Sequence, residues 1–159
     1  MTVKKQLFGI DPTAACIGKA SAASHGENIS FLQVSFEKYQ TDMRFDAVIF
    51  VASLHHMDTE SALKKAKKLL NPNGRLLIVG LSSPSSLPDF ILEALRIIPS
   101  RVISYVRKIH PCEDENIPVS FSFEKMGVLR HIFKELLPGA RIRYGLHYRY
   151  LLEWEKREL

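Results

Sequence analysis

The sequence is poor in cysteine, with only Cys16 and Cys112 among its 159 residues. Two cysteines so far apart cannot form a disulfide framework, so a reducing compartment is the simpler expectation. The sequence also lacks an uncharged apolar run long enough to cross a bilayer, because the longest apolar stretch, 89–105, contains charged residues and a proline. No signal peptide is evident either. We therefore expect a cytoplasmic protein without a membrane partner.

A strong excess of charge of one sign is absent as well. The chain has 22 basic and 17 acidic side chains, which gives a net charge of +5. This mild excess can help an anionic ligand approach, but it does not indicate nucleic acid, and no nucleic-acid partner is expected. The hydrophobic content of 46% is normal for a folded protein, and the length fits a single domain over 1–159. The spacing of His110, Cys112 and His131 matches no zinc pattern, so no metal site is expected.

Apolar runs of strand length alternate with helical patterns along the chain. The predicted strands cover 6–10, 29–36, 46–52 and 75–81, and the predicted helices cover 14–24, about 59–70, 89–98 and 123–137. Two further strands, 140–144 and 147–154, are expected to form a hairpin around Gly145. This order predicts an α/β fold with a mostly parallel sheet and an antiparallel edge at the C-terminal end.

Polar residues follow two of the predicted strands. Asp11 follows the first strand, and a carboxylate there can accept hydrogen bonds from the ribose hydroxyls of a nucleotide. The alternative is that Asp11 caps the next helix or shapes the turn. His55 and His56 follow the strand at 46–52, where a histidine can act as a base near neutral pH. The alternative is that the two histidines only shape the floor of a site.

Three stretches together are more specific than any one of them. Residues 9–13 read G-I-D-P-T, residues 45–57 read F-D-A-V-I-F-V-A-S-L-H-H-M, and residues 70–79 read L-N-P-N-G-R-L-L-I-V. The sequence resembles class I S-adenosylmethionine-dependent methyltransferases, whose patterns are G-I-D-P-S, then F-D-x-V with L-H-H, then L-K-P-G-G-x-L-L-I-V. Residues 148–156 also look like the last strand of small bacterial members. The resemblance covers nearly the whole chain and implies a Rossmann-like fold.

The resemblance also implies S-adenosylmethionine as cofactor and methyl transfer to a small-molecule acceptor. Methyl transfer from a sulfonium depends mainly on alignment, so His55 and His56 are only weak catalytic candidates. Ser35 stands where many relatives carry an acidic residue near the adenine, and Ser53 begins the stretch that lines the methyl-transfer side. The residues expected to contact the cofactor are Asp11, Pro12, Ser35, Phe36, Ser53 and Leu54.

The stretch 87–118 corresponds to the part of the family fold that covers the active site and selects the acceptor. Within this stretch, Tyr105, Arg107 and His110 are candidates to face the substrate. The alternative is that the stretch is a surface cover with ordinary amphipathic packing.

The sequence departs from the family pattern at its N-terminal end. The first strand of the family and its glycine-rich loop, of the type D-x-G-C-G-x-G, do not precede Gly9. We expect one of three explanations: a truncated chain or late start, which we favour; a strand supplied by a second copy or another protein; or a remnant that no longer binds cofactor. The alternative function is therefore a non-catalytic, methyltransferase-like binding module. An NAD-dependent oxidoreductase is disfavoured, because it too needs a glycine-rich first turn.

Overall fold

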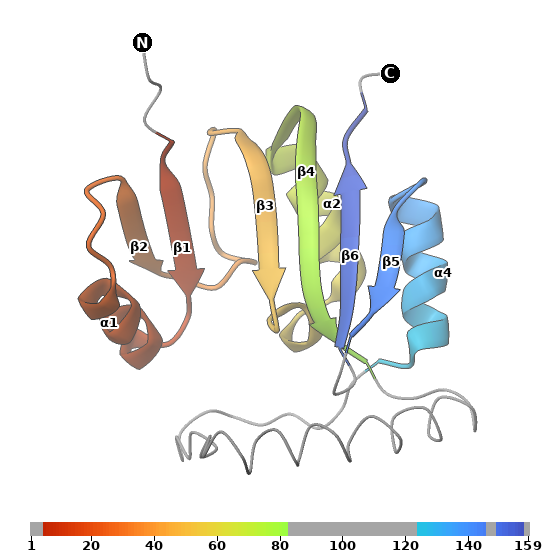
Figure 1. Ribbon diagram of the computed structural model, residues 1–159, viewed down its shortest axis with the longest axis horizontal. Coiled ribbons are helices and arrows are strands. Elements are labelled where there is room, and N and C mark those ends of the chain that lie inside the picture. Colours follow the sequence, from red (N-terminus) through yellow and green to blue (C-terminus); the bar gives the residue numbers. More distant parts are fainter. Residues whose placement is uncertain (1–4, 83–123, 146–148, 158–159) are drawn as a thin grey trace. The chain divides into compact units, whose positions relative to one another are not determined.

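The computed structural model describes residues 5–82, 124–145 and 149–157 (Figure 1). The chain divides into two units, Met1–Asp42 and Met43–Leu159, and each is described by itself. The expectation of a single domain over 1–159 stays a prediction. The helix predicted at 89–98 lies outside the described residues.

The first unit is a strand, a helix and a parallel strand: β1 (Leu7–Asp11), α1 (Ala14–Ala23) and β2 (Ile29–Gln33). The strands pair from Leu7 opposite Ile29 to Asp11 opposite Gln33. Alanine fills much of α1, in keeping with its high helix propensity. None of the described residues 5–42 is buried. Two strands and a helix without a buried residue are marginal in water by themselves.

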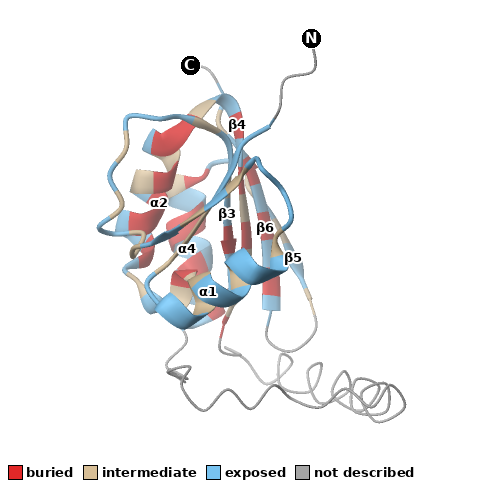
Figure 2. Ribbon diagram, turned by 90° about the vertical axis from the view of Figure 1, so that its left-hand side faces the viewer, coloured by how far each residue is buried: buried red, intermediate tan, exposed pale blue. Residues whose placement is uncertain are grey.

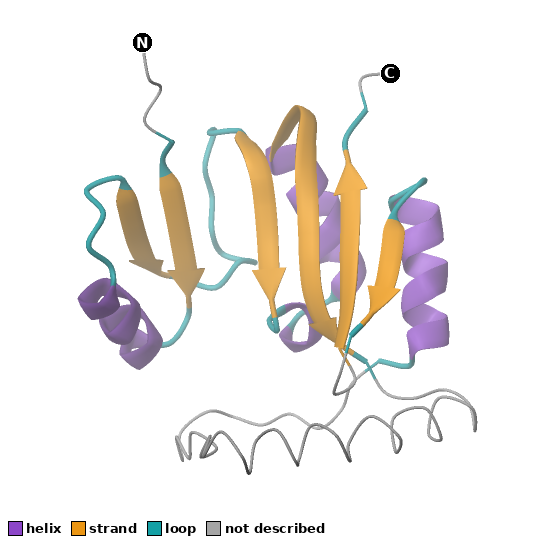
Figure 3. Cartoon of the chain, viewed as in Figure 1, coloured by secondary structure: helices purple, strands orange, loops and turns teal. Residues whose placement is uncertain are grey.

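The second unit is a four-stranded sheet with the order β3-β4-β6-β5 (Figure 3). The strand β3 pairs with β4 in parallel, whereas β6 is antiparallel to both β4 and β5. The Rossmann-like α/β class with a C-terminal antiparallel hairpin is therefore confirmed. Among the described residues, the elements of this unit are β3 (Phe45–Val51), the short 3-10 helix η1 (Leu54–His56), α2 (Thr59–Leu69), β4 (Leu70–Leu81), α4 (Met126–Leu136), β5 (Arg141–Tyr144) and β6 (Arg149–Glu155).

The core of the second unit lies between one face of the sheet and the two helices α2 and α4 (Figure 2). Alternate residues of β4 and β6 point into it, as the period of a strand requires. The rings of Phe133 on α4 and Tyr150 on β6 lie 5.7 Å apart between centroids. The Nε1 of Trp154 donates to the carbonyl of Pro138 just beyond α4, at 3.0 Å. The fully buried side chains include Leu63, Leu70, Leu76, Ile78, Phe133, Tyr150 and Leu152.

Both ends of α2 are held by side chains. The carboxylate of Asp58 accepts from the backbone N–H of Ser61 at 2.9 Å, which is an N-cap. At the other end, the Nζ of Lys156 donates to the carbonyls of Lys67 and Leu70, at 3.0 and 2.8 Å. A cation there also favours the negative end of the helix dipole. These contacts fix the helix that follows η1, and so they help to position η1 at the end of β3.

One lysine of α2 makes contacts outside its own helix. Lys67 donates to the carbonyl of Leu136 at 2.6 Å, and its Nζ lies 5.4 Å from the ring centroid of Trp154. Lys64 remains on the exposed side, where it forms an ion pair with Glu60 at 3.2 Å. Lys67 therefore joins α2 to the end of α4. The apolar methylene groups of its side chain lie near the core, while its ammonium group reaches the carbonyl of Leu136.

Candidate functional site

The first group of predicted site residues lies at the carboxyl ends of β1 and β2. The Oδ1 of Asp11 accepts from the backbone N–H of Thr13 at 2.7 Å, and its Oδ2 bonds to none of the described residues. Thr13 occupies the N-cap position of α1 without a side-chain cap bond, so Asp11 organises this turn. The carboxylate therefore shapes the turn and still has one oxygen available to a ligand. Both interpretations of Asp11 are compatible with this geometry.

Neighbouring contacts hold the two strand ends together. The Nε2 of Gln33 donates to the carbonyl of Pro12 at 3.4 Å, and the N–H of Val34 donates to the carbonyl of Asp11 at 3.1 Å. Ser35 and Phe36 follow β2 and are half-buried. The carbonyl of Ser35 accepts from the N–H of Tyr39 at 3.0 Å, which closes a turn. Because β1 and β2 are parallel and in register, the predicted ribose and adenine residues leave the same edge of this sheet.

The second group lies at the carboxyl end of β3. Ala52 follows the strand with φ of 48°, a left-handed conformation that a residue other than glycine rarely adopts, and its N–H donates to the carbonyl of Val79 at 2.7 Å. This backbone turn leads from β3 directly into η1, which carries Leu54, His55 and His56. Strained residues of this kind concentrate at functional sites, where the surrounding structure holds them. The structure thus brings Ser53–His56 together in one tight turn.

The two histidines of η1 have different environments. Their ring centroids are 3.9 Å apart, with His55 half-buried and His56 exposed. Burial lowers the pKa of His55 below 6.5, and the neighbouring His56 lowers it further. His55 is therefore neutral at physiological pH, which is the form that a proton acceptor or hydrogen-bonding group requires.

Three polar residues beside His55 were not predicted from the sequence. Thr59, Glu124 and Tyr150 line a small cavity under η1 together with His55. The Oγ1 of Thr59 donates to Oε2 of Glu124 at 3.0 Å, across 65 positions of sequence. Burial raises the pKa of the Tyr150 hydroxyl, and the negative charge of Glu124 raises it further. Of these three residues, only Tyr150 has a sequence feature that predicts burial, because it occupies an inward position in a strand of alternating pattern.

The lowered pKa of His55 predicts a pH-dependent stability. The unfolded chain binds this proton more readily than the folded chain, so the free energy of unfolding should fall as the pH drops through 6.5. We expect the denaturation midpoint to decrease between about pH 7 and about pH 5.5, with a slope of at most one proton. In His55→Gln this decrease should become smaller, as measured by urea denaturation at several pH values. His131→Gln, on the exposed side of α4, is the control, and an equal loss of slope in both variants would contradict the assignment.

The remaining expectations fall on parts that the structure describes only partly or not at all. Tyr105, Arg107 and His110, and the stretch 87–118 that holds them, lie outside the described residues. Among the residues that are described, no group of three or more His, Cys, Asp or Glu is placed to hold a metal ion. Within the same residues, no helix is long and apolar enough to span a bilayer.

Comparison with known sequences finds a family and several relatives. Residues 1–78 match the family described as "Methyltransferase domain". An uncharacterized methyltransferase of Mycobacterium tuberculosis (strain ATCC 25618 / H37Rv) is 32% identical over 113 residues, which are 69% of this chain and 55% of that protein. The ubiquinone/menaquinone biosynthesis C-methyltransferase UbiE of Hahella chejuensis is 31% identical over 87 residues, 52% of this chain and 35% of that protein. The chain thus spans about half the length of the mycobacterial relative.

Solved structures share the fold at low sequence identity. The N-methyltransferase NodS of Bradyrhizobium japonicum WM9, solved in complex with S-adenosyl-L-homocysteine, superposes with a TM-score of 0.61 at 16% identity. That match covers 96% of this chain and 67% of NodS. The YcgJ protein of Bacillus subtilis gives a TM-score of 0.62 at 15% identity, over 97% of this chain and 83% of that one. These likenesses concern the arrangement of helices and strands.

Proposed function

The chain belongs to the class I S-adenosylmethionine-dependent methyltransferases, and we propose that it binds S-adenosylmethionine and transfers the methyl group to a small-molecule acceptor. The observation that carries the proposal is the carboxylate of Asp11. It ends a parallel strand inside the matched residues 1–78, and its Oδ2 is not used by the turn. Such a position is where open α/β sheets bind the ribose of a nucleotide.

The residues around Asp11 suit an adenosine moiety. We assign the ribose hydroxyls to the carboxylate of Asp11, a charge-assisted interaction. Ser35 and Phe36 leave the neighbouring strand at the same edge, so the Ser35 hydroxyl and the Phe36 backbone N–H are the groups proposed to contact the adenine. A bound cofactor of this type supplies an activated methyl group on a sulfonium.

The turn after β3 is assigned the methyl-transfer side. Ser53 and Leu54 are proposed to contact the cofactor, and the left-handed Ala52 fixes the direction in which they leave the strand. His55 is kept neutral by burial, so it can accept a hydrogen bond or a proton from an acceptor group. His56 is exposed and is the weaker candidate. Alignment of the acceptor remains the main contribution expected of this turn.

Calorimetric titration of the 159-residue chain with S-adenosyl-L-homocysteine tests the proposal. We expect saturable binding with one site per chain, and competition by adenosine, because the assigned contacts are to the ribose and the adenine. A rise in the thermal midpoint with ligand concentration should accompany it, since a ligand that binds only the folded state stabilises that state. No heat and no thermal shift at millimolar ligand would contradict cofactor binding by this chain.

A second candidate function is a binding module that another chain completes with a strand. The observation that favours it is the edge of β3, which within the described residues pairs only with β4. An unpaired edge offers backbone donors and acceptors to an added strand. Light scattering distinguishes the possible donors: a dimer indicates a second copy of the chain, whereas a monomer that binds the cofactor counts against this function.

A further inference from the structure

The small cavity under η1 is polar on one side and has room for one small group. Its volume is about 10 Å³, which is close to the space that a single water molecule needs. Three leucine side chains form its apolar wall, and His55, Thr59, Glu124 and Tyr150 supply its polar groups. Because the cavity is so small, only the end of a larger ligand can enter it.

The polar residues of the cavity differ in their exposure. Tyr150 is 1% exposed and Thr59 is 4% exposed, so both lie at its closed end. Glu124 is exposed, and His55 is half-buried with its Nδ1 buried. Within the described residues, solvent therefore reaches the cavity from the side of Glu124 and His55. A ligand that enters from this side keeps its remaining atoms beside η1, where the methyl-transfer side is assigned.

The charge at the cavity is negative. Among the described residues that line it, Glu124 has the only carboxylate, and none is a lysine or an arginine. The negative charge of Glu124 acts at the closed end, because it adds to burial in raising the pKa of the Tyr150 hydroxyl. Burial and the neighbouring His56 lower the pKa of His55, so this ring is neutral near pH 7. A cationic group is therefore favoured over a neutral one, and an anionic group is disfavoured.

The hydrogen-bonding groups of the lining match a primary ammonium group, which has three donors and no acceptor. The Oε2 of Glu124 accepts from Thr59 Oγ1 at 3.0 Å, and a carboxylate has lone pairs for further donors. The hydroxyl oxygen of Tyr150 and one nitrogen of a neutral His55 ring are acceptors as well. Three acceptors thus line a cavity whose size suits one group with three donors.

A metal ion fits the same lining less well. Calcium and magnesium ions take about six to eight oxygen ligands, which are mostly carboxylates, carbonyls and waters. The described lining offers one carboxylate, and among the described residues no group of three or more His, Cys, Asp or Glu is placed to hold a metal ion. An ammonium group needs only the acceptors that are already there.

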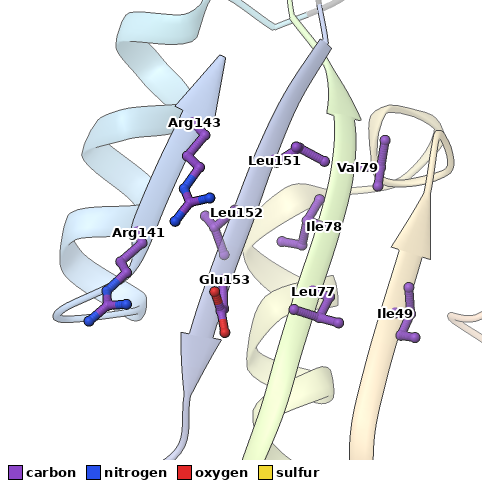
Figure 4. A pocket seen from close by; sticks show the side chains of 9 residues that line it. All are labelled: Ile49, Leu77, Ile78, Val79, Arg141, Arg143, Leu151, Leu152 and Glu153. Carbon is purple, nitrogen blue, oxygen red and sulfur yellow. The ribbon is translucent and has the colours of Figure 1, made fainter. Parts of the chain in front are cut away.

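A wider hollow of the second unit is less selective for charge. It lies on the face of the sheet opposite α2 and α4 and has a volume of about 280 Å³ (Figure 4). Apolar residues of β3, β4 and β6 line it together with Arg141, Arg143 and Glu153. Charges of both signs therefore lie there, and all three charged side chains are exposed. The cavity under η1, with one sign of charge and buried polar groups, has the clearer preference.

We propose that the cavity under η1 binds a primary ammonium group of the methyl acceptor, with Glu124 as its counter-ion and with Tyr150 and His55 as hydrogen-bond acceptors. This assignment rests on the proposed function and narrows the acceptor to a small primary amine. A nitrogen held as ammonium has no free electron pair, so it anchors the molecule and does not receive the methyl group. A second nucleophilic atom of the same molecule, outside the cavity, is the site of methylation.

Ethylammonium, ethanol and acetate test the ammonium site, because they are similar in size and differ in charge. Their binding to the 159-residue chain is followed by NMR shifts of the His55 and Tyr150 rings, at an ionic strength kept constant with sodium chloride. We expect saturable shifts with ethylammonium, at an affinity about tenfold or more above that of ethanol, because a hydrogen bond to a charged group is added. Acetate should not bind. Tetramethylammonium, which has the same charge but exceeds the cavity in size, should not bind either.

Variants test the contribution of each polar group. Glu124→Gln removes the charge and keeps an oxygen that can accept from Thr59, so the affinity for ethylammonium should fall about tenfold. Glu135→Gln, the same change on the exposed side of α4, is the control and should bind as the wild type does. Tyr150→Phe keeps the buried ring without its hydroxyl and should weaken binding about threefold. Circular dichroism checks that these variants keep the fold.

The outcomes separate an ammonium site from the alternatives. No saturable shift with ethylammonium would overturn the proposal, because the cavity would then hold water only. Equal binding of tetramethylammonium, or equal losses in Glu124→Gln and Glu135→Gln, would overturn it as well, since surface charge alone would explain the shifts. A chain that binds S-adenosyl-L-homocysteine but not ethylammonium refutes the ammonium site alone. A chain that binds ethylammonium but not S-adenosyl-L-homocysteine refutes cofactor binding instead.

Discussion

Replacing Gly80 with alanine is expected to destabilise the second unit by about 3 kcal/mol, as overpacking of a close-packed interior does. Gly80 lies in β4 directly opposite Tyr150 in β6. A Cβ at this position would stand 2.5 Å from Cε1 of the Tyr150 ring. Tyr150 is 1% exposed and packs against Phe133, so the ring cannot move aside without disturbing the core. Urea denaturation followed by circular dichroism measures the change.

The same substitution at Gly127 is a matched control without a clash. Gly127 is the second residue of α4, and a Cβ there meets nothing within 4 Å. Gly127→Ala should therefore leave the stability unchanged or raise it by up to about 0.5 kcal/mol, because the propensity difference of a helix interior is reduced in the first turn. In the background Tyr150→Val, the cost of Gly80→Ala should fall by more than 1 kcal/mol, because the clash is removed. An unchanged cost in that background would show that the ring does not cause the effect.

Replacing Asp11 with asparagine is expected to weaken binding of S-adenosyl-L-homocysteine by about 10- to 100-fold. Asparagine keeps an oxygen that can accept from the N–H of Thr13, so the turn after β1 is preserved. It removes the negative charge and one acceptor, and a hydrogen bond to a charged group contributes about 1.5–3 kcal/mol. Calorimetric titration of the variant and the wild type measures the loss.

Asp42→Asn is the control for this variant. Asp42 is exposed, and it follows the last residue of β2 by nine positions in the sequence. It should bind the ligand as the wild type does. If Asp11→Asn bound equally well, Asp11 would serve only to shape the turn. If both variants lost affinity equally, general charge rather than a ribose contact would explain the change.

Most of the fold could be predicted from the sequence because hydrophobic period and turn residues agree along the chain. The apolar run at 46–52 predicts a strand, and β3 occupies it; the helical pattern at about 59–70 is likewise confirmed by α2. The hairpin around Gly145 is also confirmed. The placement of β6 between β4 and β5 was not predicted, because period alone cannot say which strand of a hairpin pairs inward. The burial of Trp154 and its bond to Pro138 accompany this arrangement.

The candidate site could be predicted only in part. Asp11 and the two histidines could be predicted because they directly follow predicted strands and belong to the G-I-D-P-T and L-H-H stretches. The left-handed backbone of Ala52 carries no sequence signal, since alanine is common in ordinary helices and glycine would be expected at such a φ. The bond between Thr59 and Glu124 depends on tertiary packing across distant segments. The assigned roles of the cofactor residues stay predictions.

The absence of buried residues in the described part of the first unit affects how any affinity at Asp11 should be understood. With no interior of its own, this βαβ segment has a small local free energy of opening, and its amides should exchange with solvent far faster than those of β4 and β6. A ligand held by the ends of β1 and β2 must then order these strands as it binds. Its observed dissociation constant includes that ordering, so changes that rigidify the segment would tighten binding without touching the ligand.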